Sequence, residues 1–184
     1  GAIVLDTKGD KDHNYIWLIS DKEYADFELT LSVKVLRETK GNSGVQIRSR
    51  YLNHPKKGKW LHGPQIDIHP STPFRTGLIY DETFENQRWI SPSLPNWDIK
   101  PENTSHLVTW KKGWNTLVIR AEGTNIKTWL NGTPVADLDG MGLLNDDAHQ
   151  KHRVGMHGHI ALQLHNRDDI AMAFKELRIK KLNP

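Results

Sequence analysis

Alternation of apolar and polar side chains over residues 25–36 restricts the fold of this chain more than any other feature of its sequence. Every second residue from Phe27 to Val35 is apolar, whereas Glu28, Thr30, Ser32 and Lys34 between them are polar. In a β-strand, successive side chains point to opposite faces, so a period of two marks a strand with one face buried. The pattern predicts such a strand here and excludes an amphipathic helix.

The same pattern returns along the chain, at residues 45–50, 65–69, 117–121, 126–130 and 160–165. Asn131-Gly132 follows one of these segments directly and favours a type I′ hairpin turn, because both central residues of that turn need positive φ. A break in the alternation between Phe174 and Leu177 predicts a β-bulge. The proline-rich stretch over residues 60–101 predicts an irregular loop around one strand.

Many short strands with no helical segment between them predict an all-β sandwich or jelly roll of two antiparallel sheets. The 184 residues suit one domain, spanning residues 1–184. Lys and Arg number 25 against 22 Asp and Glu, and the two signs are interspersed, which argues against a nucleic-acid-binding face. No apolar run is long enough to span a bilayer. The absence of cysteine excludes disulfides, thiolate catalysis and cysteine-based zinc sites.

Polar side chains share one face on three of the predicted strands, opposite Ile and Leu. They are Gln46 and Arg48, then Gln65, Asp67 and His69, and finally Gln163 and His165. We expect these faces to converge and bring Arg48, Asp67 and His165 into one groove. Asp and His on one face could serve as base and acid or hold a divalent metal. The alternative is an ordinary solvent-exposed strand face.

Tryptophan is the second candidate feature, with seven residues in the chain. We expect Trp17, Trp110 and Trp114 in the core, because they adjoin strand patterns. Trp60, Trp89 and Trp97 lie in the proline-rich loops, and Trp129 lies on the polar side of its strand beside Lys127. Indole faces stack on the apolar face of a sugar ring, so these aromatics could form a saccharide platform. Alternatively, they pack loops onto the sandwich.

Taken together, the segments resemble the 3-keto-disaccharide hydrolase family, a concanavalin A-like jelly roll. The resemblance runs from about Tyr15 to Leu182 and rests on the order of several short motifs. They include Gly41-Asn42-Ser43-Gly44-Val45, Gly63-Pro64-Gln65-Ile66-Asp67-Ile68, Trp129-Leu130-Asn131-Gly132 and the segments at residues 24–29, 76–80, 113–115, 160–165 and 174–179. The chain departs from the family in its central strand, where Glu and then Gln are common and Gln65 and Asp67 stand here.

The resemblance implies cleavage of glycosides that are already oxidised to a ketone at C3, in a groove on the concave face. It implies Asp67 or His165 as the base and Arg48 as the hydrogen-bond donor to the C3 oxygen. Substrate-binding residues would be Gln46, Gln65, His69, Tyr80, Trp89, Trp129 and Gln163. No cofactor is certain, although a divalent metal could replace the donor. The expected partner is a carbohydrate.

Two other functions stay open at this point. A conventional glycosidase needs two carboxylates at a defined separation, and Asp67 has no such partner on its strand. A non-catalytic carbohydrate-binding module of the concanavalin-like class would bind sugar without cleaving it, and a structural cell-surface domain would not bind sugar. We expect export to the periplasm or the cell surface, with a signal peptide that is not part of these 184 residues.

Overall fold

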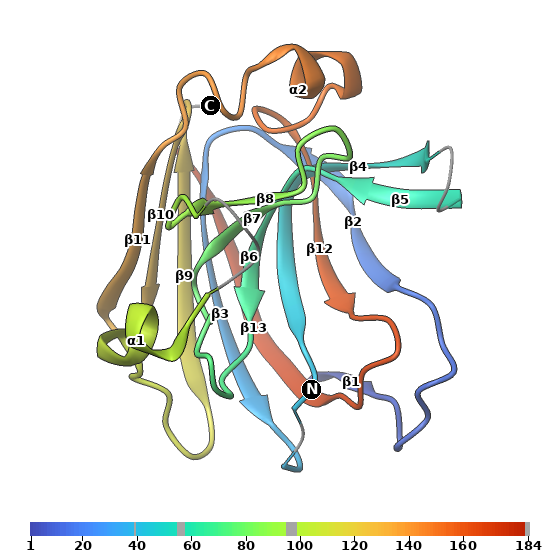
Figure 1. Ribbon diagram of the computed structural model, residues 1–184, viewed down its shortest axis with the longest axis vertical. Coiled ribbons are helices and arrows are strands. Elements are labelled where there is room, and N and C mark those ends of the chain that lie inside the picture. The colour runs from blue at the N-terminus through green and yellow to red at the C-terminus, as the bar shows by residue number, and fades with distance from the viewer. Residues whose placement is uncertain (39, 55–57, 95–98, 183–184) are drawn as a thin grey trace.

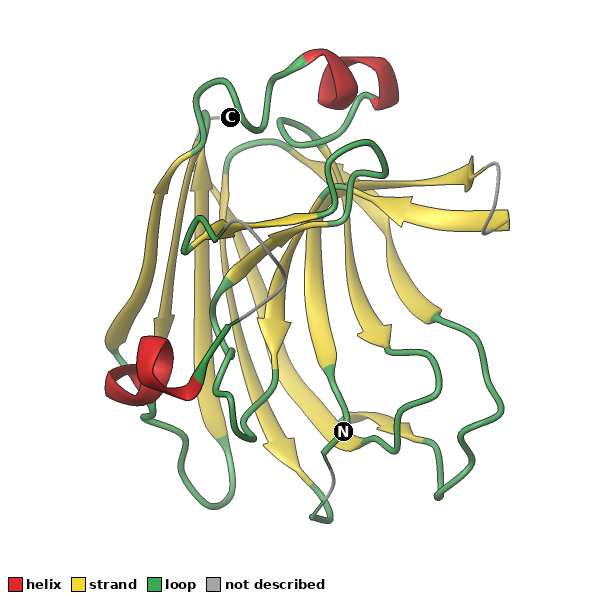
Figure 2. Ribbon diagram, in the orientation of Figure 1, coloured by secondary structure: helices red, strands yellow, loops and turns green. Residues whose placement is uncertain are grey.

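Two antiparallel β-sheets lie face to face in the computed structural model, which describes residues 1–38, 40–54, 58–94 and 99–182 (Figures 1 and 2). Within these residues the first sheet has six strands, in the order β1 (Ile3–Asp6), β13 (Ala171–Lys181), β3 (Phe27–Val35), β9 (Asn115–Glu122), β10 (Asn125–Leu130) and β11 (Thr133–Asp139). The non-sequential order means that strands distant in the chain pair with each other, as in a jelly roll.

The described part of the second sheet has seven strands. Six run in the order β2 (Ile16–Tyr24), β12 (Gly158–Leu164), β4 (Ser43–His54), β6 (Pro64–Ile68), β7 (Ile79–Asp81) and β8 (Arg88–Ser91), and β5 (Gly58–His62) pairs with the outer end of β4. The β4–β5 hairpin projects from the body of the sandwich in Figure 1. The described helices are short: α1 (Pro101–Thr104), a 3-10 turn at Ser105–Leu107 and α2 (Asp147–His152).

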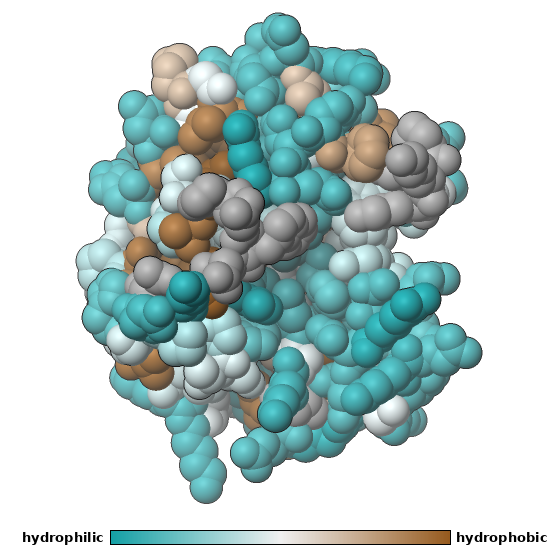
Figure 3. Space-filling model, in the orientation of Figure 1, coloured by the Kyte–Doolittle hydropathy of each residue, from teal (hydrophilic) through white to brown (hydrophobic). Residues whose placement is uncertain are grey.

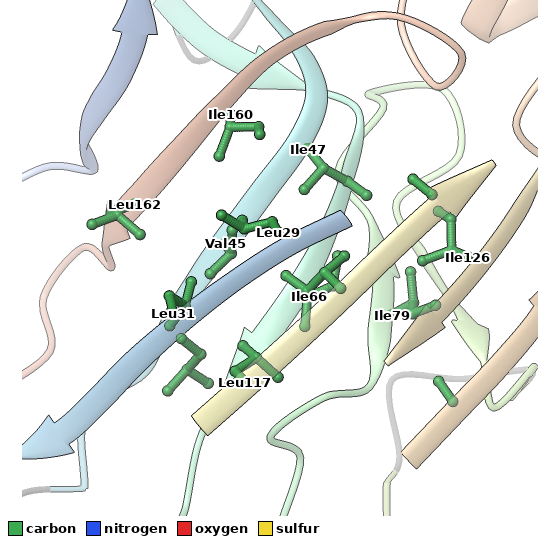
Figure 4. Packing of buried hydrophobic residues seen from close by; sticks show 14 of the residues in the cluster. Leu29, Leu31, Val45, Ile47, Ile66, Ile79, Leu117, Ile126, Ile160 and Leu162 are labelled. Carbon is green, nitrogen blue, oxygen red and sulfur yellow. The ribbon is translucent and has the colours of Figure 1, made fainter. Parts of the chain in front are cut away.

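The apolar side chains of the predicted alternating strand fill the space between the sheets. Phe27, Leu29, Leu31 and Val33 are all fully buried, and polar residues between them face outward. Figure 4 shows Leu29 and Leu31 facing apolar side chains of the second sheet, among them Val45, Ile47, Ile66, Ile160 and Leu162. The all-β sandwich is therefore confirmed.

Local backbone features confirm the turn and bulge predictions. Asn131 and Gly132 have φ of 52° and 82°, as a type I′ turn between β10 and β11 requires. In β13 the register with β3 shifts between Lys175 and Arg178, and Glu176 has a positive φ of 55°. This bulge adds one residue to β13 and explains the break in alternation.

The proline-rich stretch is more regular than predicted. Instead of one strand in a loop, residues 58–91 contain β5, β6, β7 and β8. β6 is the strand that the alternation at residues 65–69 predicted. The other three, β5, β7 and β8, have three to five residues each and show no clear period of two in the sequence. No helix in the described residues is long and apolar enough to cross a membrane.

Candidate functional site

A pocket of about 370 Å³ opens on the outer face of the second sheet, above β6 and β7. Ile66 and Ile68 of β6 point into the core, so the pleat turns the residues between and beside them outward. Six residues predicted from the sequence line this pocket: Gln65, Asp67, His69, Tyr80, Trp89 and His165. Because it contains residues that the sequence suggested for catalysis, we call this candidate site the catalytic pocket below, as a name and not as an established role.

Asp67 is the most unusual group in the catalytic pocket, because its carboxyl is almost fully buried. Only 1% of the residue is exposed, and Arg75 Nε donates a hydrogen bond of 2.8 Å to Oδ2. The other oxygen, Oδ1, has no hydrogen-bond partner among the described residues. Burial raises the pKa of Asp67, and the charges of Arg75 and His69 oppose that rise. A buried carboxylate with one unpaired oxygen can accept a proton from a bound molecule.

Two amide oxygens beside Asp67 are also buried without partners in the described structure, namely Oε1 of Gln65 and Oδ1 of Asn42. Gly44 makes room for Gln65, since a Cβ at Gly44 would lie 2.5 Å from Gln65 Cδ. Buried acceptors without donors are costly, so their concentration in one pocket points to a ligand rich in hydroxyl groups.

His165 lies at the edge of the catalytic pocket in a chain of polar contacts. Its Nδ1 is 3.1 Å from Asp168 Oδ2, and its Nε2 is 3.0 Å from the hydroxyl oxygen of Tyr15. With the Nδ1 proton donated to Asp168, Nε2 accepts the hydrogen bond from Tyr15. Burial raises the pKa of Tyr15. Burial also acts to raise the pKa of Asp168, but hydrogen bonds from His165 and from the Asn42 backbone outweigh it, so the pKa of Asp168 is lowered overall. The ionised Asp168 thus orients His165 toward Tyr15.

His69 completes this part of the pocket as a neutral imidazole. Its Nδ1 donates to the carbonyl oxygen of Pro73 at 3.0 Å. Burial lowers the pKa of His69, and the charge of Arg75 lowers it further, although Asp67 acts in the opposite direction. His69 therefore supplies a hydrogen-bonding group rather than a charge at neutral pH.

Arg48 does not lie in the catalytic pocket, so the expected grouping of Arg48 with Asp67 and His165 is wrong. β4 and β12 pair at Gln46 and again at Ser49, but between these pairs β4 has two residues, Ile47 and Arg48, and β12 has only Ile160. Arg48 sits at this bulge with a positive φ of 47°, which reverses the expected direction of its side chain.

The Arg48 guanidinium is fully buried at one end of the sandwich. It forms an ion pair of 3.0 Å with Asp26 and donates to the carbonyl oxygens of Ala25, Gly123 and Gly155. Burial lowers the pKa of Arg48 to about 10, while Asp26 opposes this effect, so the side chain stays charged at neutral pH. Its contacts join turns of both sheets, which is a structural role.

Three further predicted substrate-binding residues do not line the catalytic pocket. Trp129 lies on β10, on the outer face of the other sheet. Gln46 is buried on the expected sheet face, where its amide contacts the Leu61 carbonyl oxygen at 3.5 Å. Gln163 is also fully buried, and neither polar atom of its side chain has a partner in the described structure.

Some residues of the catalytic pocket were not predicted as site residues. They are Tyr15, Lys40, Asn42, Trp60, Arg75, Glu82, Gln87 and Asp168. Most of them lie in turns and loops, where no periodicity indicates the direction of a side chain. Asn42 and Trp60 carried a signal, the first in a glycine-flanked turn and the second as a loop aromatic. Trp17 is half-buried and packs on Tyr15 and Trp60 rather than in the core, and Trp97 lies outside the described residues.

Among the described residues, the catalytic pocket contains no group of three His or carboxylate side chains whose ligand atoms lie close enough together to hold one divalent metal. In the part of the chain that the structure describes, one group of three His or carboxylate side chains has ligand atoms within 4.8 Å of one another: His62, Glu85 and His152. None of these lines the catalytic pocket. Glu85 is already paired with Lys151 and His152, each at 2.8 Å.

Comparisons with known proteins agree with this architecture. Residues 1–180 match the sequence profile of the 3-keto-alpha-glucoside-1,2-lyase-like domain. A search of curated proteins found no match.

Three solved structures illustrate the likeness in fold. A "putative glycosyl hydrolase" from Parabacteroides distasonis is 18% identical, with a TM-score of 0.57, and the match covers 99% of this chain and 81% of that one. A structure from work on endo-acting O-glycanases expressed by prominent members of the human gut microbiota is 13% identical, with a TM-score of 0.59 and coverage of 100% and 80%. A Bacillus subtilis protein of unknown function with a galectin-like fold is 8% identical, with a TM-score of 0.54 and coverage of 98% and 82%. At these identities the likeness establishes the jelly-roll fold.

Proposed function

The chain belongs to the 3-keto-alpha-glucoside-1,2-lyase-like family, and we propose that it cleaves glycosides that carry a ketone at C3. The observation that carries this proposal is the buried Asp67 carboxyl, whose Oδ1 has no partner in the described structure and whose pKa is raised. A carboxyl in this state suits the removal of a weakly acidic carbon-bound proton. The unpaired oxygens of Gln65 and Asn42 suit the sugar hydroxyls.

The first chemical step uses the acidity that the C3 ketone gives to the proton on C2. Asp67 takes this proton. The electron pair of the broken C2–H bond forms a C2=C3 double bond, and the ketone oxygen on C3 becomes the negatively charged enolate oxygen. The enolate then expels the group at C1: the C1–O bond breaks, and its electron pair goes to the leaving oxygen. The products are a sugar with a double bond between C1 and C2 and the released aglycone. Water can later add to that double bond and complete a net hydrolysis.

The leaving oxygen needs a proton, and Tyr15 is placed to donate one. Its hydroxyl contacts His165 Nε2 at 3.0 Å, and burial keeps the phenol protonated by raising its pKa. Before the transfer His165 Nε2 accepts the Tyr15 hydrogen bond and so fixes the position of the hydroxyl, while Asp168 orients His165. The phenolate left after the transfer takes up a proton again from solvent. We assign Tyr15 as the acid and His165 as its positioning residue.

Negative charge on the C3 oxygen requires a donor other than Arg48. Arg75 and Lys40 both line the catalytic pocket and are the cations that we assign to this role. Arg75 is already oriented by its hydrogen bond to Asp67. One side chain can thus face both the base and the enolate that the base creates.

The test uses 4-nitrophenyl 3-keto-β-glucoside and its unoxidised parent glucoside. We expect release of nitrophenol from the ketone alone, at a rate above that in buffer. Asp67→Asn should lower kcat/KM about 100-fold or more, since general bases contribute roughly 10²–10⁴-fold. Asp137→Asn is the matched control, because that carboxylate lies on β11 and its side chain is 69% exposed. The control should keep wild-type activity.

Other outcomes would identify a different function. Full activity of both Asp67→Asn and His165→Ala would rule out the assigned site. Equal release from both glucosides would indicate ordinary acid–base hydrolysis by a carboxylate pair. Saturable sugar binding without any release would indicate a carbohydrate-binding module.

A further inference from the structure

A second hollow adjoins the catalytic pocket, and we call it the aromatic pocket. It has a volume of about 590 Å³, and its lining includes Tyr15, Trp17, Tyr51 and Trp60 together with the cations Lys59 and Arg167. Figure 3 shows this side of the molecule hollowed below the projecting β4–β5 hairpin, which carries Tyr51, Lys59 and Trp60. Tyr15 and Trp60 line both pockets, so the two hollows adjoin at these two side chains.

The four aromatic rings form one packed cluster. Trp17 stacks on Tyr15 with ring centroids 5.4 Å apart and planes 10° from parallel. Trp60 meets both rings edge-on, at 4.7 Å from Tyr15 and 5.6 Å from Trp17, and Tyr51 meets Trp17 at 5.8 Å. Each ring thereby holds its neighbour in place.

This cluster is separate from the hydrophobic core. None of the four aromatics belongs to the two core clusters of the described residues. Tyr51 is 45% exposed, although it is a large aromatic side chain. Rigid aromatic faces around a hollow of 300–1,000 Å³ are typical of ligand sites, where they stack on flat rings.

The charges of the two pockets differ in a way that bears on the ligand. The described lining of the aromatic pocket contains Lys59 and Arg167 and no carboxylate. The catalytic pocket, in contrast, contains Asp67, Glu82 and Asp168. A group in the aromatic pocket therefore meets apolar faces and positive charge, which suits an oxygen that becomes negative as its bond to C1 breaks.

We propose that the aromatic pocket binds the leaving group of the glycoside, and that this group is a flat ring without positive charge. The proposal rests on the function proposed above, because it takes the oxidised sugar to occupy the catalytic pocket. Tyr15 lies where the pockets meet, with its hydroxyl bonded to His165. A ligand that spans both pockets places its glycosidic oxygen beside this hydroxyl.

The kinetic test compares methyl and 4-nitrophenyl 3-keto-β-glucosides, with aglycone release followed by chromatography. We expect Tyr51→Ala to lower kcat/KM about 10-fold for the aryl substrate, mainly through KM, and less than twofold for the methyl substrate, because the Tyr51 ring packs on Trp17 and not on the acid Tyr15. The partly exposed Tyr51 ring also makes this variant safe for folding. Trp17→Ala should lose more on the aryl than on the methyl substrate, but with some loss on both, because Trp17 also stacks on Tyr15. Trp114→Ala is the matched control. This half-buried indole lies against Lys34 and Lys175 of the first sheet and does not line the aromatic pocket.

Equal losses on both substrates in Trp17→Ala and Tyr51→Ala, or no loss on either, would overturn the assignment. A binding test separates this outcome from failure of the proposed function. Calorimetry with the unoxidised phenyl and methyl β-glucosides requires no turnover. Tighter binding of the phenyl glucoside, reduced about 10-fold in Trp17→Ala, would support the ring subsite even if no glycoside is cleaved. Equal affinity of the wild-type protein for both glucosides would refute it.

Discussion

Replacing Arg48 by methionine should unfold the sandwich more easily rather than remove a catalytic cation. The guanidinium has no exposed surface and donates to Asp26 at 3.0 Å, to the carbonyl oxygens of Ala25 and Gly123 at 2.6 Å each, and to that of Gly155 at 3.2 Å. Methionine fills part of the same volume but donates no hydrogen bond. The variant would leave these oxygens without their donor at the end of the sandwich.

The size of the effect follows from two opposing contributions. Each hydrogen bond to a charged group contributes roughly 1.5–3 kcal/mol net, whereas removing the buried guanidinium also relieves a desolvation cost of several kcal/mol. Removing one partner of a buried ion pair typically costs about 3–5 kcal/mol, and we expect Arg48→Met to fall in this range. For a chain of this size, 1 kcal/mol corresponds to about 2–4 °C in Tm, so Tm should fall by roughly 6–20 °C.

Urea denaturation followed by tryptophan fluorescence would measure this difference. Arg120→Met is the control, because that side chain is 41% exposed and its ion pair with Glu122 is a surface pair worth at most about 1 kcal/mol. If Arg48→Met matches wild type in stability within about 1 kcal/mol yet loses activity, the structural role is refuted and the cation belongs to the reaction.

Two predictions concern pH. Burial opposes the charge of His149, but hydrogen bonds and charges from Asp81 and Asp146 outweigh burial and raise its pKa. The charged imidazole therefore stabilises the fold below about pH 6.5, and this contribution should be lost as pH rises through the higher folded pKa. Denaturation of wild type and His149→Asn between pH 5 and 9 should converge at high pH, and a constant difference would contradict the reasoning. In the catalytic pocket, Arg75→Ala should raise the pKa of Asp67 further, since Arg75 opposes the effect of burial. The acidic limb of the kcat/KM profile should then move to higher pH, whereas an unmoved limb would exclude Asp67 as the base.

The all-β architecture could be predicted because each long strand carries its own signal. Residues 27–35 alternate without interruption, and the structure buries the expected face completely. The hairpin at Asn131-Gly132 and the bulge before Leu177 were also predictable, since both depend on local backbone preferences. Of the four strands in residues 58–91, β6 was predictable from the alternation at residues 65–69, whereas β5, β7 and β8 were not, because they are short and show no clear period of two.

The candidate site was predictable only where side chains alternate regularly between the two faces of a strand. The alternation at residues 65–69 correctly predicted that Gln65, Asp67 and His69 point to the outer face of the sheet, where all three line the catalytic pocket. It failed at Arg48, because one extra residue in β4 reverses every side-chain direction beyond it. A bulge of this kind depends on the partner strand, which the local sequence does not specify.

Alternation along each strand fixes which of its faces is apolar, and hence that two sheets bury these faces against each other. The sequence also supplied the chemical groups of the site, because Asp67 and His165 follow from alternation. Which groups meet depends instead on the folded arrangement, in which His165 contacts Tyr15 and Asp168, and Asp67 pairs with Arg75. The folded arrangement also produces the burial that raises the pKa of Asp67. The difference arises because alternation is a local property of one strand, whereas burial, bulge position and charge pairing depend on segments that are distant in the chain.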